Sequence, residues 1–336
     1  MGDGFSRPGR RGVLAGAAVA TLAGATRGVR AQPAAAFVPS RPVVLVVSNP
    51  AGGTNDFTAR LVAEPLSQRL GVPVVVENRP GGNGVVGTQY AARARPDGHT
   101  LDVAPTGAFA VAPHLFSPLP YDNKRAFAPI SLLASNAMFV CVHPASGIGS
   151  YADLIARAKA QPGKLSYGHA GVGTSQHLGA ELFKYMAHID IAPVPYRGTT
   201  ALMPDLLANR ITMSFANIVN VVPLAREGKL RALAITSIKR SVLAPDLPTM
   251  AESGFPGFEA VPWFGLLAPS GTPKDILDKL HGETVKTLAM PEVRKKFDEL
   301  GLEPVGNTPA EFAAIIRKET PEWAKVIKDA GIKLGN

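Results

Sequence analysis

The stretch from residue 43 to residue 56 joins an apolar run to a glycine turn and then to the start of an amphipathic helical pattern. The run at 43–47 consists of valine and leucine, which is typical of a parallel strand covered on both faces. Gly52 and Gly53 then leave backbone N–H groups uncovered where the helix begins, an arrangement that suits an anion. The chain is therefore restricted to folds that layer helices on a buried parallel sheet.

The same order of strand, glycine turn and helix recurs in residues 165–177. Gly171 and Gly173 supply the turn, and the hydroxyl groups of Thr174 and Ser175 are suited to cap the following helix. Two loops of this kind that face each other would hold one small acid from both sides. The sequence thus predicts an anion site between two similar loops.

Apolar runs that suit strands alternate with helical patterns along the chain. The runs occupy residues 43–47, 72–76, 101–104, 138–142, 191–196, 213–215, 230–236 and 264–268. This alternation is the signature of an α/β fold.

A chain of 336 residues is long for one domain, so two domains with separate cores are expected. Passages rich in proline and glycine, near 143–147 and 255–262, mark the crossings between them. We therefore predict a first lobe of residues 37–140 plus 262–336 and a second lobe of residues 141–261. A double crossing of this kind permits hinge closure around a ligand.

Residues 1–31 are predicted to be an export signal rather than part of the fold. Arg10 and Arg11 precede an apolar stretch at 12–25, and the residues up to Ala31 fit a small-residue cleavage site after Ala31. The apolar stretch is shorter than the roughly 20 residues that span a bilayer, which argues against a membrane anchor. The paired arginines leave both the general and the twin-arginine export routes open.

The remaining charge does not indicate nucleic acid as a partner. The signal contains five arginines and one aspartate, so 30 basic and 25 acidic residues remain, and they form no Lys/Arg run. The seven histidines show no paired spacing that suits a metal. Cys141 is the only cysteine, which excludes an internal disulfide and predicts a buried structural thiol. We therefore expect no metal and no cofactor.

Seven segments give the chain a resemblance to the Bug family, the TctC-like extracytoplasmic solute-binding proteins of tripartite tricarboxylate transporters. Each segment is weak evidence by itself, but their order and spacing together are specific. They are Pro50-Ala51-Gly52-Gly53 with Asp56 and Arg60, and residues 74–87, 96–101, 118–122, 167–178, 194–198 and 247–254.

The resemblance implies a two-lobed periplasmic binding protein of the Venus-flytrap, type II-like fold, with a ligand cleft between the lobes. Such a protein closes on a small organic acid or related carboxylated compound and delivers it to a membrane permease, and we expect it to act as a monomer. The resemblance also implies that backbone groups of the two glycine loops hold the ligand carboxylates. The residues predicted to bind ligand are Asn49, Pro50, Ala51, Gly52, Gly53, Thr54, Asn55, Asp56, Thr106, Gly107, His169, Ala170, Gly171, Val172, Gly173, Thr174, Ser175, His177, Tyr196, Arg197, Gly198 and Asn217.

Two of these positions depart from the usual pattern of the family. His169 stands where the family commonly has a small residue, and it could add a donor or a charge to the pocket. Asn217 stands where an acidic residue is frequent, and the loss of an acid would suit a more anionic ligand or remove a counter-charge for an amine. Asp56 has two open interpretations, as a residue that stabilises the start of its helix or as a contact for a ligand amine, with Arg60 one turn away to offset its charge.

Two other functions remain open at this point. A hydrolase could use Ser175 as nucleophile and His177 as base, although the Gly-x-Ser-x-Gly elbow and an ordered Asp partner are missing. A sensor could present its closed form to a receptor kinase instead of a permease. Binding without catalysis is the function that the sequence favours.

Overall fold

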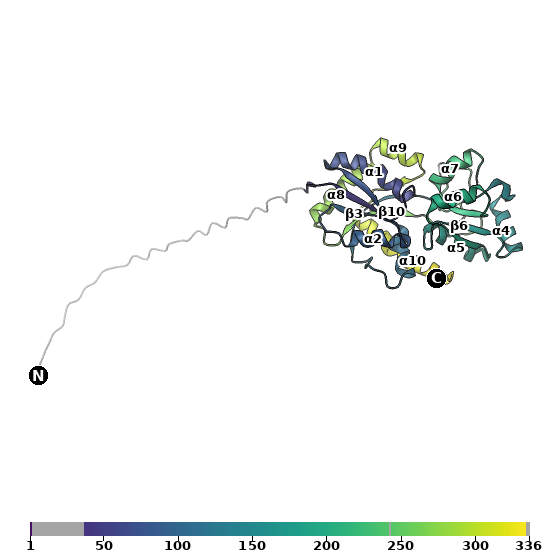
Figure 1. Cartoon of the computed structure of the whole chain (residues 1–336), viewed down its shortest axis with the longest axis horizontal. Coiled ribbons are helices and arrows are strands. Elements are labelled where there is room, and N and C mark those ends of the chain that lie inside the picture. The colour runs from purple at the N-terminus through teal and green to yellow at the C-terminus, as the bar shows by residue number, and fades with distance from the viewer. Residues whose placement is uncertain (2–36, 242, 334–336) are drawn as a thin grey trace, which may run out of the picture. The chain divides into compact units, whose positions relative to one another are not determined.

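Two mixed β-sheets with helices packed on their faces form the described part of the chain (Figure 1). The structure is a computed structural model that describes Met1, residues 37–241 and residues 243–333. The predicted export signal therefore lies outside the described residues, Met1 apart. The described residues from 37 onward belong to one compact unit, and the α/β class predicted from the sequence is confirmed.

The first sheet, with the helices on it, defines lobe 1. Its strand order is β11-β4-β10-β3-β1-β2, in which β2, β1 and β3 run parallel and β10, β4 and β11 pair antiparallel. The strands are β1 (Val43–Val47), β2 (Val74–Asn78), β3 (Thr100–Pro105), β4 (Phe127–Ser135), β10 (Trp263–Pro269) and β11 (Glu303–Pro304). The helical segments are α1 (Thr54–Leu70), η1 (Gly82–Gly84), α2 (Val85–Ala92), η2 (Gly107–Val111), α3 (Ala112–Leu115), α8 (Lys274–Leu288), α9 (Pro291–Glu299) and α10 (Pro309–Asp329).

Helices cover both faces of this sheet, which explains the continuous apolar run of β1. The α1, α8 and α9 helices pack around Leu45 and Leu101 on one face. On the other face, α2, η2 and α10 pack around Val46, and α10 contributes Phe312 to this cluster. Side chains on both sides of β1 are consequently buried.

The second sheet, with its helices, defines lobe 2. Its strand order is β7-β6-β8-β5-β9, with β6 parallel to β7 and β8 and with β5 antiparallel to β8 and β9. The strands are β5 (Met138–Val142), β6 (Ser166–His169), β7 (Ala192–Pro195), β8 (Met213–Asn217) and β9 (Arg231–Ile235). The helical segments are η3 (Pro144–Ser146), α4 (Tyr151–Ala160), α5 (Ser175–Ala187), α6 (Thr199–Leu207) and α7 (Ile218–Arg226). Cys141 is buried in β5, as the sequence predicts.

The chain crosses between the sheets twice. It leaves lobe 1 between Ser135, the end of β4, and Met138, the start of β5, and it returns at Trp263 with β10. The backbone N–H of Asn136 donates to the carbonyl of Pro262 at 3.0 Å, so the two crossings are tied to each other. We propose to place the first lobe boundary here rather than at residue 140. The α10 helix also contacts α5, so the C-terminal helix touches both lobes (Figure 1).

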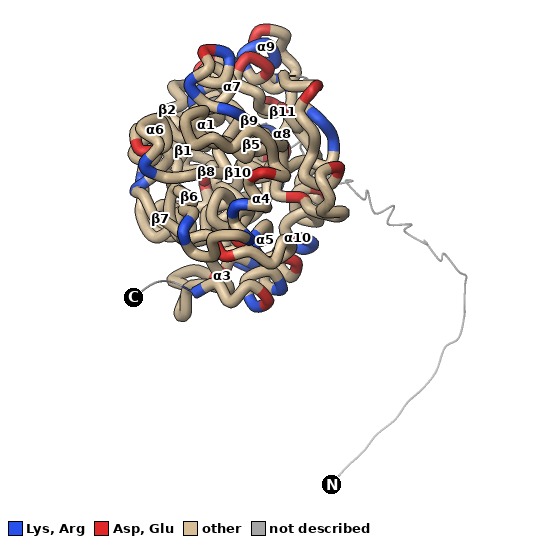
Figure 2. Tube along the Cα trace, turned by 90° about the vertical axis from the view of Figure 1, so that its right-hand side faces the viewer, with Lys and Arg blue, Asp and Glu red and all other residues tan. Residues whose placement is uncertain are grey.

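The surface of this unit combines both signs of charge. Figure 2 shows Lys and Arg interspersed with Asp and Glu around the tube. Among the helices that the structure describes, none has the length and apolar character needed to cross a membrane.

Gly265 in β10 tests the packing of α10 on the first sheet. A Cβ atom at this position would lie 1.9 Å from Phe312 Cζ, and Phe312 is fully buried. We expect Gly265→Ala to lower the free energy of unfolding by about 1–3 kcal/mol, because overpacking forces neighbouring groups to shift. Urea unfolding followed by circular dichroism measures this change.

Gly282 provides a matched control within α8. A Cβ atom there would meet nothing within 4 Å, and alanine favours a helix over glycine. Gly282→Ala should therefore stabilise the protein by about 0.5–1 kcal/mol. Equal effects of the two substitutions would contradict the packing described.

Candidate ligand-binding site

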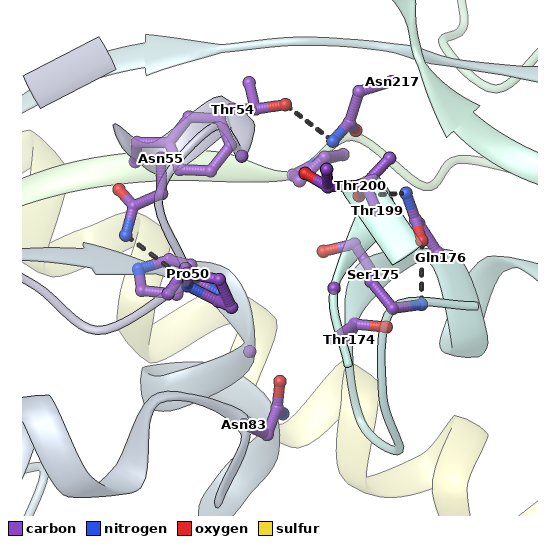
Figure 3. A pocket seen from close by; sticks show the side chains of 18 of the residues that line it. Pro50, Thr54, Asn55, Asn83, Thr174, Ser175, Gln176, Thr199, Thr200 and Asn217 are labelled. Carbon is purple, nitrogen blue, oxygen red and sulfur yellow. Dashed lines mark hydrogen bonds between the residues drawn. The ribbon is translucent and has the colours of Figure 1, made fainter. Parts of the chain in front are cut away.

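A cavity of about 180 Å³ lies between the two lobes, at the carboxyl ends of strands from both sheets (Figure 3). Lobe 1 contributes the segments that follow β1 and β3, together with η1 and the start of β10. Lobe 2 contributes the segments that follow β6, β7 and β8. The lining residues are Asn49, Pro50, Ala51, Gly53, Thr54, Asn55, Asn83, Pro105, Gly107, Ala170, Thr174, Ser175, Gln176, Arg197, Gly198, Thr199, Thr200, Asn217, Pro262 and Phe264.

Four helices begin at this cavity. Thr54, Ser175 and Thr199 are the first residues of α1, α5 and α6, and Asn217 immediately precedes α7. The first N–H groups of a helix have no partner within the helix, and each helix start carries about half a positive charge. The described residues that line the cavity include Arg197 and no carboxylate. The electrostatic environment therefore favours an anion.

Hydrogen bonds to α1 and β3 hold the first glycine loop, which follows β1, in place. The Gly52 N–H donates to Asp56 Oδ2 at 2.9 Å, and Asn55 Nδ2 donates to the carbonyl of Val103 in β3 at 2.8 Å. Gly52 has φ 79°, a left-handed conformation that is unfavourable for residues other than glycine. These bonds leave the N–H groups of the first turn of α1 at the cavity.

Asp56 supports this loop and does not line the cavity. Its carboxylate is buried and accepts hydrogen bonds from Gly52, from Arg60 Nε at 3.0 Å and from Asn78 Nδ2 at 3.0 Å. Burial acts to raise the pKa of Asp56, but these bonds together outweigh it and hold the pKa below its usual value. The geometry favours the interpretation of Asp56 as a helix-start residue, although the N-cap position itself is Gly53.

The second glycine loop is connected to the next helix start by Gln176. Its Oε1 accepts from the N–H of Ala170 at 2.9 Å, and its Nε2 donates to Thr199 Oγ1 at 3.1 Å. Thr174 is the N-cap of α5, as predicted, and its hydroxyl accepts from the N–H of His177. The hydroxyl of Ser175 points into the cavity (Figure 3).

A direct hydrogen bond joins the lobes across the cavity. Asn217 Nδ2 in lobe 2 donates to Thr54 Oγ1 in lobe 1 at 2.7 Å (Figure 3). Asn217 Oδ1 accepts from Asn136 Nδ2 at 3.3 Å, at the crossing between the lobes. A chain of polar contacts therefore runs from the start of α1 to the hinge.

Thirteen of the predicted ligand-binding residues lie in the cavity wall and nine do not. The nine are Gly52, Asp56, Thr106, His169, Gly171, Val172, Gly173, His177 and Tyr196. Their contact with a ligand stays a prediction, since several of their polar groups are bonded elsewhere than in the cavity wall.

The partners of these residues explain why they lie outside the cavity wall. Thr106 Oγ1 accepts from the Trp263 N–H at 2.8 Å, so Thr106 supports the return crossing. The Tyr196 hydroxyl donates to Asp205 at 2.7 Å. His169 and His177 are buried behind the second loop, where they accept hydrogen bonds from its backbone.

Seven lining residues were not predicted from the sequence. Gln176 lies in α5 between two residues that were predicted, and Asn83 follows a pair of glycines in a segment of the family resemblance. The sequence context of these two residues could have predicted that they line the cavity. The full set is Asn83, Pro105, Gln176, Thr199, Thr200, Pro262 and Phe264.

The two lobes, the double crossing and the cavity of helix starts define a solute-binding protein of the periplasmic type. The chain belongs to the family described as "Tripartite tricarboxylate transporter family receptor", whose model matches residues 58–332. This confirms the resemblance to the Bug and TctC-like proteins.

Relatives and solved structures agree with this assignment. Protein BugT of Bordetella pertussis is 36% identical over 311 residues, which cover 92% of this chain and 95% of BugT. A Rhodopseudomonas palustris protein solved with adipate superposes with a TM-score of 0.85 at 35% identity, covering 88% of this chain and 99% of that one. MatC of Rhodopseudomonas palustris, solved with malate, gives a TM-score of 0.80 at 32% identity, covering 86% and 99%.

Asp56→Asn tests the support of the first loop. We expect it to lower the free energy of unfolding at pH 7 by about 1–3 kcal/mol, because three donors lose a charged acceptor. The folded pKa lies below 3.8, so the contribution of Asp56 is complete above that pH and is lost as pH falls through the folded pKa. Urea unfolding at pH 7 and pH 3 measures both effects.

Asp275 is the matched control, since it is an exposed aspartate in the first turn of α8. Asp275→Asn should change stability by no more than about 0.5 kcal/mol. An Asp56→Asn protein as stable as the Asp275→Asn protein would show that the carboxylate does not hold the loop.

Proposed function

We propose that the protein is an exported receptor that binds a small carboxylate-bearing compound in the cavity between its lobes. The convergence of four helix starts on a cavity without a lining carboxylate is the observation that carries this proposal. The relatives solved with adipate and with malate support it, because both compounds are dicarboxylates. The proposed ligand-binding residues are those that line the cavity.

A dicarboxylate would couple binding to closure. One carboxylate would accept from the first-turn N–H groups of Thr54 and Asn55 in lobe 1, and the other from those of Ser175 and Gln176 in lobe 2. Side-chain amides and hydroxyls in the wall would complete the hydrogen bonds. Since each lobe supplies part of the site, a ligand favours the closed arrangement over the open one.

We propose that the protein makes and breaks no bond. Ser175 faces the cavity, whereas His177 is buried beneath the loop and its Nδ1 accepts from the N–H of Gly173 at 3.2 Å. Burial, and then the neighbouring His169 and Lys184, lower the pKa of His177 to about 3. A general base works best with a pKa near the operating pH, so this histidine is poorly suited to activate Ser175.

Family membership supports a tripartite tricarboxylate permease as the partner that receives the ligand. We further propose that the protein is exported to the periplasm, is cleaved after Ala31 and acts as a monomer. Mass spectrometry of the exported protein identifies the first mature residue. Size-exclusion chromatography with light scattering tests the monomer.

Malate and adipate are the compounds with which to test binding. At one hundred times Kd, either ligand should raise the free energy of unfolding by about 2.7 kcal/mol, and the ligand should be recovered unchanged. Asn217→Asp should weaken binding at least tenfold, or about 1.4 kcal/mol, because it places a negative charge beside the helix starts. Thermal unfolding over a ligand titration measures both values.

Asn209→Asp controls for the change in net charge. Asn209 is exposed in a turn of lobe 2 with φ 54°, which aspartate tolerates, and we expect unchanged affinity. No stabilisation across a panel of mono-, di- and tricarboxylates would contradict carboxylate binding. Ester hydrolysis that disappears in Ser175→Ala would instead support the hydrolase.

A further inference from the structure

Two buried histidines stand behind the second glycine loop. His169 is the last residue of β6, and His177 lies in the first turn of α5. Their rings are 4.4 Å apart, and the residues are only 1% and 6% exposed. The loop between them lines the cavity through Ala170, Thr174 and Ser175.

Each ring accepts a hydrogen bond from the backbone of this loop. The Gly171 N–H donates to His169 Nδ1 at 3.3 Å, and the Gly173 N–H donates to His177 Nδ1 at 3.2 Å. A nitrogen that accepts carries no proton, so these two bonds require neutral rings with the proton on Nε2. The loop thus turns two N–H groups inward, with Gly171 at φ 131° and Gly173 at φ 80°.

We propose that His169 and His177 are a pair of positioning residues that hold the ligand-facing loop 170–175 in its binding shape only while both rings are neutral. Protonation of Nδ1 replaces an acceptor with a donor, so the bond from the loop is lost. Ligand binding therefore weakens in acid. The consequence for binding rests on the proposed function, whereas the hold on the loop does not.

The charged groups that act on the pair are Glu181, which acts to raise the pKa of His169, and Lys184, which acts to lower that of His177. Tyr167, on β6, packs its ring against both histidines, and its hydroxyl donates to Glu181 on α5. Glu181 also accepts from Lys184 Nζ at 2.8 Å, so its charge is already paired. Asn83, Val111 and Leu115, the nearest lobe 1 side chains to Gly173, carry no charge.

Acid shifts the equilibrium from the held loop toward the released loop. Burial lowers the pKa of both histidines. For His169 it outweighs the Gly171 backbone bond and Glu181, which act to raise the pKa, and for His177 the nearby His169 and Lys184 add to the lowering. A histidine released into water has a pKa of about 6.5, so the released loop binds more protons than the held loop as pH falls below that value. From pH 7.5 to pH 5.0 the ratio of released to held loop should rise about thirtyfold for each histidine that becomes protonated on release.

Amide hydrogen exchange of Gly171 and Gly173, by NMR on the ligand-free mature chain, tests the hold directly. After correction for intrinsic exchange rates, we expect their protection factors to fall at least tenfold from pH 7.5 to pH 5.0. Amides in β1 should not change in parallel. Protection factors that stay constant within threefold would overturn the proposal.

The double variant His169→Asn and His177→Asn separates titration from packing. An asparagine Oδ1 can accept in place of Nδ1 and does not titrate, so protection should persist at pH 7.5 and not fall at pH 5.0. His177→Leu, which has no acceptor, should lose protection of Gly173 at both pH values. Should these variants not fold, the wild-type pH series decides the proposal alone.

His143 supplies the matched control. Its Nδ1 accepts from the N–H of Ala145 at 3.0 Å, but it is half-buried and does not line the cavity. His143→Asn should leave the acid response of Gly171 and Gly173 unchanged, and loss of that response would contradict the assignment.

Calorimetry with malate at the same two pH values tests the effect on binding. The ratio of the acid Kd to the neutral Kd should be larger in the wild type than in the double asparagine variant, since titration of malate itself affects both equally. Equal ratios would overturn the proposed weakening. No malate binding at either pH would count against the proposed function alone, and the exchange data would still decide the role of the histidines.

Discussion

The site depends on helix starts that gather around one cavity and whose first N–H groups have no partner within the helix. Four helix starts converge there, and the described lining residues bring no carboxylate to compete with a ligand. Such an arrangement is costly unless the loops are rigid, because a flexible loop would turn its N–H groups to the nearest internal acceptor. The rest of the site can be understood as the means of holding these loops.

Both glycine loops solve this problem in the same way. In lobe 1, Asp56 accepts the N–H of Gly52, and in lobe 2, His169 and His177 accept those of Gly171 and Gly173. Each acceptor lies behind its loop and takes a glycine N–H inward, and the N–H groups of Gly53 and Thr174 that follow donate to carbonyls within the same loops. The two kinds of acceptor respond differently to acid. A carboxylate with a lowered pKa remains charged at a pH where a released histidine becomes protonated.

The elements with strong local signals were predictable from the sequence. The β1 strand, the glycine turn and the start of α1 follow from adjacent residues, and the family resemblance extended this to both lobes. The nine-residue strand β4 was missed, because Pro129 and its alanine and serine residues lack a strand pattern. The inward turn of Gly171 and Gly173 was missed as well, since sequence spacing does not show toward which side of a loop an N–H points.

Lining residues from distant segments were equally hard to predict. Asn83 lies in η1 with φ 53°, and this backbone conformation places its side chain beside Gly107 and Gly173 at the cavity. Pro262 and Phe264 reach it because the return crossing pairs β10 with β3. The contacts of the return crossing depend on tertiary pairing over more than 150 residues of separation, as in the bond between Thr106 and Trp263.

The contact between Asn217 and Thr54 connects recognition to closure. It joins the start of α1 to the residue that precedes α7, and Asn136 links the same amide to the crossing. An acidic residue at 217 would accept the hydroxyl of Thr54 but would also repel a ligand carboxylate. The asparagine instead donates to Thr54 without adding charge, so the lobes can be joined beside an anion. On the proposed function, closure and anion selectivity would therefore depend on the same side chain.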